Sequence, residues 1–184
     1  VSPNGVWREF LEIEQAKYVA INLLNLDNWP QWNSTAQRIL SSEKGYLRQG
    51  QRFDLHRIER QQLIEEMWEV KFIRKGNNPE FTEIGFDWLG QISNGKKSGN
   101  AIKSLSLEIT VLCQEEGGVE IAAWWQISKW SKFFKAKIEN SAEKKLKQIR
   151  KDARLAYFRT KSQYPETLAG RIAQIRFCLL YTSD

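Results

Sequence analysis

The stretch Leu63–Ile92 reads LIEEMWEVKFIRKGNNPEFTEIGFDWLGQI, and it decides the fold class. Two runs in which apolar and polar residues alternate flank residues 75–79, Lys-Gly-Asn-Asn-Pro, whose composition is typical of a turn. If Val70 lies opposite Ile84, the alternation continues in phase across this turn. The stretch therefore predicts an antiparallel hairpin with one buried face. That face consists of Ile64, Trp68, Val70, Phe72, Ile84, Phe86 and Trp88.

Further strands are predicted on both sides of this hairpin. Residues 104–113 and 119–127 alternate in the same way around a Glu-Glu-Gly-Gly turn, and pairing Val111 with Ile121 leaves one face apolar. Residues 6–13, 37–43 and 51–59 also read as strands, and residues 93–100 as a polar hairpin loop. Between the first and second of these strands, residues 16–26 and 29–36 predict two short helices.

The hydrophobic period changes after residue 131. Apolar residues then recur at steps of four and three over residues 132–160, which predicts one stripe of a long helix. Neither Gly nor Pro interrupts this segment before Pro165. An antiparallel sheet followed by a long amphipathic helix buries both apolar faces if the sheet curls around the helix. The stripe consists of Phe134, Ile138, Ala142, Leu146, Ile149, Ala153 and Tyr157.

The composition is that of one globular domain. The chain has 184 residues, a mass of 21.6 kDa and a net charge of +6. Two cysteines and one histidine exclude most metal sites and most cysteine–histidine chemistry, and no cofactor motif is present, so we expect neither a metal nor a cofactor. Without an apolar leader segment or a run of about 20 apolar residues, we expect a cytoplasmic protein.

The last seven residues, Cys178–Asp184, are predicted to have a different origin from the rest of the chain. The string CLLYTSD resembles the translation of a transposase sequencing adapter, and such segments are excluded from fold reasoning. The alternative is a genuine C-terminal tail. We therefore expect a domain over residues 1–162, a C-terminal extension over 163–177 and a segment over 178–184 that is not native. Cys113 is then the single native cysteine.

Two short motifs carry a resemblance to a known family. They are Asp27–Asn33, which reads DNWPQWN, and Gln49–Phe53, which reads QGQRF. With the order of strands and helices over residues 6–160, they resemble the START-like superfamily, in particular the SRPBCC family of polyketide cyclases/dehydrases and lipid-transport proteins. The resemblance implies an α+β helix-grip fold, in which a curved antiparallel sheet of about seven strands wraps around a long C-terminal helix, with two short helices after strand one.

The same resemblance implies a cavity between the sheet and the long helix. Family members bind hydrophobic or amphipathic small molecules there, and a minority catalyse cyclisation or dehydration. Apolar side chains with few polar ones suit such a pocket, although ordinary core packing explains the same residues. Our candidate ligand-binding residues are Phe53, Arg57, Glu66, Trp68, Phe86, Trp88, Trp125, Phe134 and Ile138.

Three charged residues share a strand face with apolar neighbours. These residues are Glu9, Arg57 and Glu66. Burial of an unpaired charge is costly, and desolvation of a carboxyl group favours general acid–base chemistry. Glu66 and Glu9 are therefore the candidate catalytic residues, while a Glu66–Arg57 ion pair is the structural alternative. His56 falls on the opposite face, and no nucleophile–base–orienter triplet is evident.

Three functions remain open at this stage. The first is a binding module for a lipid or polyketide-like molecule, and the second is an enzyme of the cyclase/dehydrase type. The third uses the predicted long helix, which carries ten Lys or Arg between residues 131 and 160, to meet RNA, the ribosome or a phospholipid surface. A solvated basic helix face is the alternative to the third, and the oligomeric state is open.

Overall fold

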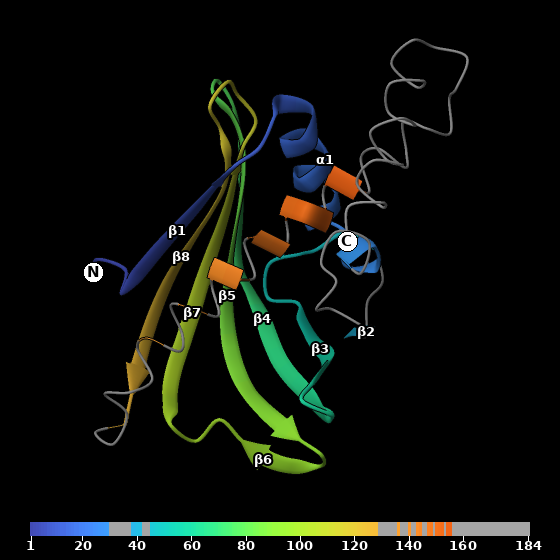
Figure 1. The fold of residues 1–184 in the computed structure, drawn as a ribbon, viewed down its shortest axis with the longest axis vertical. Coiled ribbons are helices and arrows are strands. Elements are labelled where there is room, and N and C mark those ends of the chain that lie inside the picture. Colours follow the sequence, from blue (N-terminus) through green and yellow to red (C-terminus); the bar gives the residue numbers. More distant parts are fainter. Residues whose placement is uncertain are drawn as a thin grey trace.

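The computed structural model describes residues 1–29, 38–41 and 45–128, together with separate positions between residues 136 and 155. One antiparallel sheet dominates it, with the strand order β1-β8-β7-β5-β4-β3-β2 and with β6 paired to β5 beside this path. The sheet is curved, and helix α1 lies on its concave side (Figure 1). The elements are β1 (Gly5–Phe10), α1 (Ile13–Leu23), the 3-10 helix η1 (Leu26–Asn28), β2 (Arg38–Ser41), β3 (Arg52–Glu59), β4 (Gln62–Asn77), β5 (Glu80–Ser93), β6 (Lys96–Ser98), β7 (Ile102–Leu112) and β8 (Gly118–Ile127).

The predicted hairpin over residues 63–92 is present as β4 and β5, but its predicted register is wrong. Val70 lies opposite Phe86 and not opposite Ile84, and the strands run on to Asn77 and Glu80. The register shifts between Val70 and Phe72, which is a β-bulge. A bulge adds one residue to a strand, so the alternation changes phase there.

Phe72 is the residue that the bulge moves away from its predicted face. It lies opposite Gly85, whereas the next residue, Ile73, lies opposite the fully buried Ile84. A Cβ atom built on Gly85 would stand 2.4 Å from the Phe72 ring, so the missing side chain of Gly85 makes room for that ring. The guanidinium of Arg74 covers the ring at 4.3 Å from its centroid.

The second predicted hairpin is present as β7 and β8, again with a different register. Ile109 lies opposite Ile121, and Val111 lies opposite Val119. The predicted pairing of Val111 with Ile121 is therefore wrong by two residues. A shift by two keeps every side chain on its own face, so the predicted apolar face survives the correction.

The elements that precede β3 differ from the sequence prediction at their boundaries. The first strand ends at Phe10, and Ile13, predicted as strand, begins α1. Glu14 in the first turn of α1 suits the positive end of the helix dipole. The predicted second short helix, residues 29–36, lies mostly outside the described residues. The predicted loop over residues 93–100 contains the short strand β6.

The core lies between α1 and the concave face of the sheet. Val19 and Leu23 of α1 join Val70, Ile84 and Val111 of the sheet in one buried cluster. Trp29, which follows η1, donates a hydrogen bond from Nε1 to the carbonyl oxygen of Leu23 at 3.0 Å. Its ring packs edge-on against two further aromatic rings, at 5.5 Å from Phe53 and 5.7 Å from Phe86.

The predicted long helix lies largely outside the described residues. The positions between 136 and 155 that are described have helical backbone, among them Ala136, Lys144 and Arg150. Phe134, Ile138 and residues 163–184 are not among them. No helix within the described part of the chain is both long and apolar enough to cross a membrane.

Candidate functional site

A row of large side chains crosses the concave face, partly within the core and partly beside it. Phe53 on β3 lies opposite Trp68 on β4, which lies opposite Trp88 on β5. Two strands further on, Trp125 of β8 lies opposite Leu105 of β7. Cross-strand neighbours on one face touch, so five strands contribute apolar surface at one level of the sheet.

Burial divides the predicted ligand-binding aromatics into two groups. Phe53 and Phe86 are each 2 % exposed and form a three-ring cluster with Trp29. The core alternative therefore describes these two residues. Trp68 and Trp125, at 6 % and 9 % exposed, are buried as well, and Trp68 belongs to the core cluster. Trp88, in contrast, is only partly buried and packs against the core, as does its neighbour Leu105. Trp125 stacks on Trp7 with ring centroids 6.3 Å apart.

A charged pair stands beside this row. Arg57 donates to Oε1 of Glu66 from Nη2 at 2.9 Å and from Nε at 3.3 Å. Trp68 donates from Nε1 to the other carboxylate oxygen, Oε2, at 3.3 Å. The two charged side chains are largely buried, at 17 % and 8 % exposed. The ion pair that we gave as the structural alternative is thus present, and it keeps two charges on an apolar face without a net charge.

Glu9, the second candidate catalytic carboxylate, is separated from Glu66. It projects from β1, and its Oε1 accepts a hydrogen bond from Nη1 of Arg150 at 2.5 Å. Arg150 is one of the described helical positions after residue 131, so one cation of the basic segment is turned toward the sheet. Its Nε is buried without a partner. The two candidate carboxylates therefore belong to two different ion pairs.

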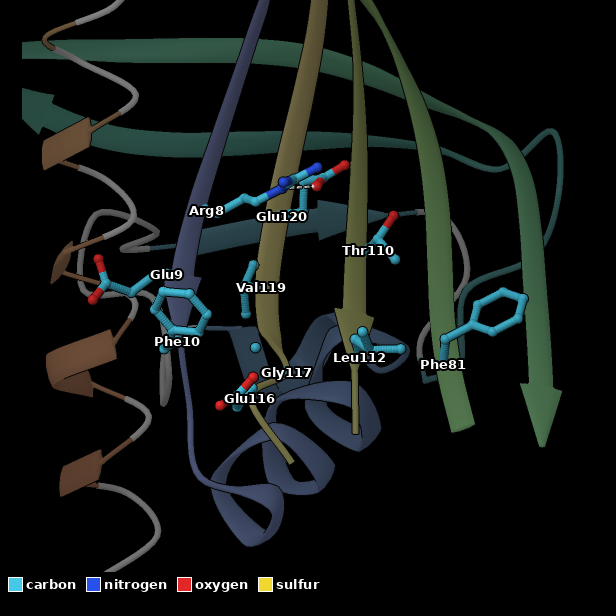
Figure 2. A pocket seen from close by; sticks show the side chains of 11 residues that line it. Arg8, Glu9, Phe10, Phe81, Thr110, Leu112, Glu116, Gly117, Val119 and Glu120 are labelled. Atoms are coloured by element: carbon cyan, nitrogen blue, oxygen red, sulfur yellow. Dashed lines mark hydrogen bonds and ion pairs between the residues drawn. The ribbon is translucent and has the colours of Figure 1, made fainter. Parts of the chain in front are cut away.

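Two concavities, each of about 490 Å³, are found at the end of the sheet where β1 leads into α1. The first lies on the outer, convex face, and Figure 2 shows Leu112 between Phe10 on one side and Phe81 on the other. Gly118, which lies opposite both Phe10 and Leu112, lines it between these two side chains. The second is lined by the start of α1 together with Arg150 and Arg154.

Neither concavity contains the aromatic row of the concave face. The sequence contains little indication of the two concavities. Gly118 has the appearance of an ordinary turn glycine, and nothing in the sequence shows that it lies beside the exposed Phe10. Among the described residues, no group of three or more His, Cys, Asp or Glu side chains is placed to hold a metal ion.

The fold has solved counterparts, although no family model and no curated protein matches the chain by sequence. Ara h 8.0201 superposes with a TM-score of 0.54 at 10 % identity, over 81 % of this chain and 97 % of that one. The Zhui aromatase/cyclase from Streptomyces sp. R1128 superposes with a TM-score of 0.50 at 11 % identity, over 90 % and 95 %. The fold is therefore shared with these solved proteins, as the resemblance in the sequence implied.

A third solved counterpart is larger than this chain. The di-domain ARO/CYC BexL from the BE-7585A biosynthetic pathway superposes with a TM-score of 0.57 at 9 % identity, over 82 % of this chain and 45 % of that one. Identities this low establish the fold and leave function to be argued from the site. The resemblance read from the two motifs is thus confirmed for the curved START-like sheet, of which β3 begins within the second motif.

Proposed function

We propose that this START-like chain binds a hydrophobic or amphipathic small molecule, such as a lipid or a polyketide-like compound, against the concave face at Trp68 and Trp88. The observation that carries the proposal is an apolar row that is buried at Trp68 and only partly buried at Trp88, with the Arg57–Glu66 pair beside it. Ligand sites are mostly apolar with a few placed polar groups. The solved counterparts support the proposal, because two of them are described as aromatase/cyclase proteins.

The charge balance of the pair favours a neutral polar group on the ligand. Because Arg57 neutralises Glu66 at 2.9 Å, neither a free carboxylate nor a free amine gains an unopposed counterion there. A hydroxyl group can donate to Glu66, whose oxygens are acceptors. We therefore expect neutral sterols, fatty alcohols or phenolic polyketides to bind better than the corresponding acids or amines.

A binding assay with a fluorescent probe tests the proposal. 1-Anilinonaphthalene-8-sulfonate gains fluorescence in an apolar site, and a neutral ligand that takes the site displaces it. Trp88→Ala is expected to weaken probe and ligand binding about tenfold or more, because it removes the partly buried ring of the aromatic row. The matched control is Leu89→Ala, since Leu89 is 45 % exposed and is the extra residue at the register shift of β5. Equal affinity in both variants would rule out this site.

The cyclase/dehydrase alternative needs Glu66 to move a proton. The Glu66→Gln variant keeps a hydrogen-bonding side chain of the same shape but cannot act as an acid or base at neutral pH. In a binding module, ligand affinity survives this change within about threefold. In an enzyme, turnover of a bound polyketide substrate falls by about 10²–10⁴ while binding persists.

The third function expected from the sequence, binding of RNA, the ribosome or a phospholipid surface by the basic segment after residue 131, stays a prediction. Most of that segment lies outside the described residues, and Arg150 is engaged by Glu9. Binding to RNA or to anionic vesicles would weaken steeply with salt, so the affinity at two ionic strengths tests it. A cytoplasmic location likewise stays a prediction.

A further inference from the structure

Strand β1 forms one edge of the sheet, and half of its main-chain groups point outward. Leu11 donates its N–H to the carbonyl oxygen of Gly117 at 3.2 Å. This bond shows which residues of β1 are hydrogen-bonded to β8. Hydrogen-bonded positions alternate along an antiparallel strand. Trp7 and Glu9 are therefore bonded to β8 like Leu11. The N–H and C=O groups of Val6, Arg8 and Phe10 face the edge beside which no other described strand lies.

The side chains at this edge are exposed and largely apolar. Val6 is 43 % and Phe10 is 67 % exposed. Arg8, which stands between them, forms an ion pair with Glu120 of the neighbouring strand on the outer face (Figure 2). Soluble proteins usually protect a sheet edge with lysine, proline or a covering segment. An edge with two exposed apolar residues is instead suited to pair with another strand.

The order of the three edge residues, Val6, Arg8 and Phe10, indicates which kind of strand can pair with β1. Apolar, charged, apolar reads the same in both directions along the chain. We propose that a second copy of this chain pairs with β1 antiparallel, about a two-fold axis at Arg8. Val6 then lies opposite Phe10 of the partner subunit, and the reverse contact is identical, as an isologous interface requires. This proposal is independent of the proposed ligand site on the concave face.

The charges also balance in this register. The two Arg8 side chains meet at the axis, and each keeps its own Glu120 on the outer side. The two Arg8 and two Glu120 side chains therefore carry two positive and two negative charges. A register shifted by two residues toward the N-terminus places Asn4 opposite Phe10 and loses the apolar contacts, so the register centred on Arg8 is the favoured one.

The interface is small, and we expect a weak dimer. Three facing pairs exchange about six main-chain hydrogen bonds, and two apolar pairs add about 0.2–1 kcal/mol each. Interfaces of this size are typical of transient complexes. Sedimentation equilibrium over about 5–500 μM is expected to show a mass that rises from 21.6 kDa toward twice that value. A protein that stays monomeric throughout this range overturns the proposal.

Lysine substitutions on β1 test whether the dimer forms through this strand or through another surface. Phe10→Lys and Val6→Lys change exposed side chains, so the fold is expected to survive, and each is expected to weaken dimerisation at least tenfold. Leu89→Lys is the matched control, because Leu89 is a similarly exposed apolar residue on β5, away from the edge. Loss of the dimer in the Leu89 variant, or its persistence in both edge variants, overturns the proposal.

Disulfide trapping tests the register. In the proposed dimer the two Arg8 positions form a hydrogen-bonded pair with Cα atoms about 5.5 Å apart, which a disulfide spans. The two Val6 positions stand four residues apart along the strands, about 13 Å. In a Cys178→Ser background, in which the remaining Cys113 is buried, Arg8→Cys is expected to cross-link and Val6→Cys is not. Equal cross-linking of the two variants contradicts the two-fold axis at Arg8.

Discussion

Arg57 and Glu66 form a two-bond ion pair on the concave face of the sheet, with Nη2 and Nε of the guanidinium both directed at Oε1. The two residues come from adjacent strands and are offset diagonally, since Leu55 lies opposite Glu66. Their side chains are 17 % and 8 % exposed, so little water screens the pair. The pair thus sets the polarity at the end of the proposed ligand site.

Removal of one partner of this pair is expected to destabilise the fold. Arg57→Met leaves the Glu66 carboxylate buried without its counterion, and we expect a loss of about 2–4 kcal/mol in the free energy of unfolding. Urea denaturation measures it. The double variant Arg57→Met/Glu66→Leu removes both charges and is expected to recover at least half of that loss. A double variant as unstable as the sum of the two single variants would contradict the account.

Gly85→Ala is expected to destabilise the protein by about 1–3 kcal/mol, because the new methyl group meets the Phe72 ring at 2.4 Å. In a Phe72→Ala background the same change is expected to be nearly neutral, since the obstructing ring is gone. Chemical denaturation of the four proteins gives the coupling. If Phe72 faced the core instead, Gly85→Ala would stabilise the strand by about 0.5–1 kcal/mol, and that result would restore the register read from sequence.

Glu108 links stability to pH on the outer face. Burial and the nearby Glu83 raise the pKa of Glu108 above its ordinary value, against the opposing effect of Arg74 and Lys71. The folded protein therefore holds this proton to a higher pH than the unfolded chain does. The stability due to the protonated form is present below the unfolded pKa and is lost as the pH rises through the folded pKa.

Glu108→Gln is accordingly expected to raise Tm by about 1–3 °C at pH 7, with the gain shrinking toward pH 4. Thermal unfolding at a series of pH values measures this difference. Glu69→Gln is the control, because Glu69 bonds Arg52 at 2.6 Å on the same face and its loss is expected to give no gain. A gain for Glu108→Gln that is constant with pH would show that its cause is not the ionisation.

The face of most strand residues was predictable from the sequence, whereas the register, and with it the face of Phe72, was not. Alternation alone assigned Trp68, Phe86 and Trp125 to the concave face, because side-chain direction has a period of two. The bulge beside Phe72 carries no such signal: it depends on the contact between that ring and Gly85 across the hairpin. A pairing inferred by counting residues outward from a turn fails once one strand gains a residue.

The candidate site was predictable in the same partial way. The alternation along the strands placed two charged residues, Arg57 and Glu66, on apolar faces. It also suggested their ion pair. The partners of Trp29 and of Glu9 were not, because Phe86 and Arg150 lie far from them in sequence. Contacts of this kind depend on how α1 and the segment after residue 131 sit against the sheet.

The central claim is that the concave face holds a hydrophobic molecule at Trp68 and Trp88. Native mass spectrometry of the protein purified from cells, followed by organic extraction, tests this claim most directly. We expect a co-purifying neutral hydrophobic compound in near-stoichiometric amount, reduced about tenfold in the Trp88→Ala variant. A clean unliganded mass, with no uptake from a panel of lipids and polyketides, would contradict it.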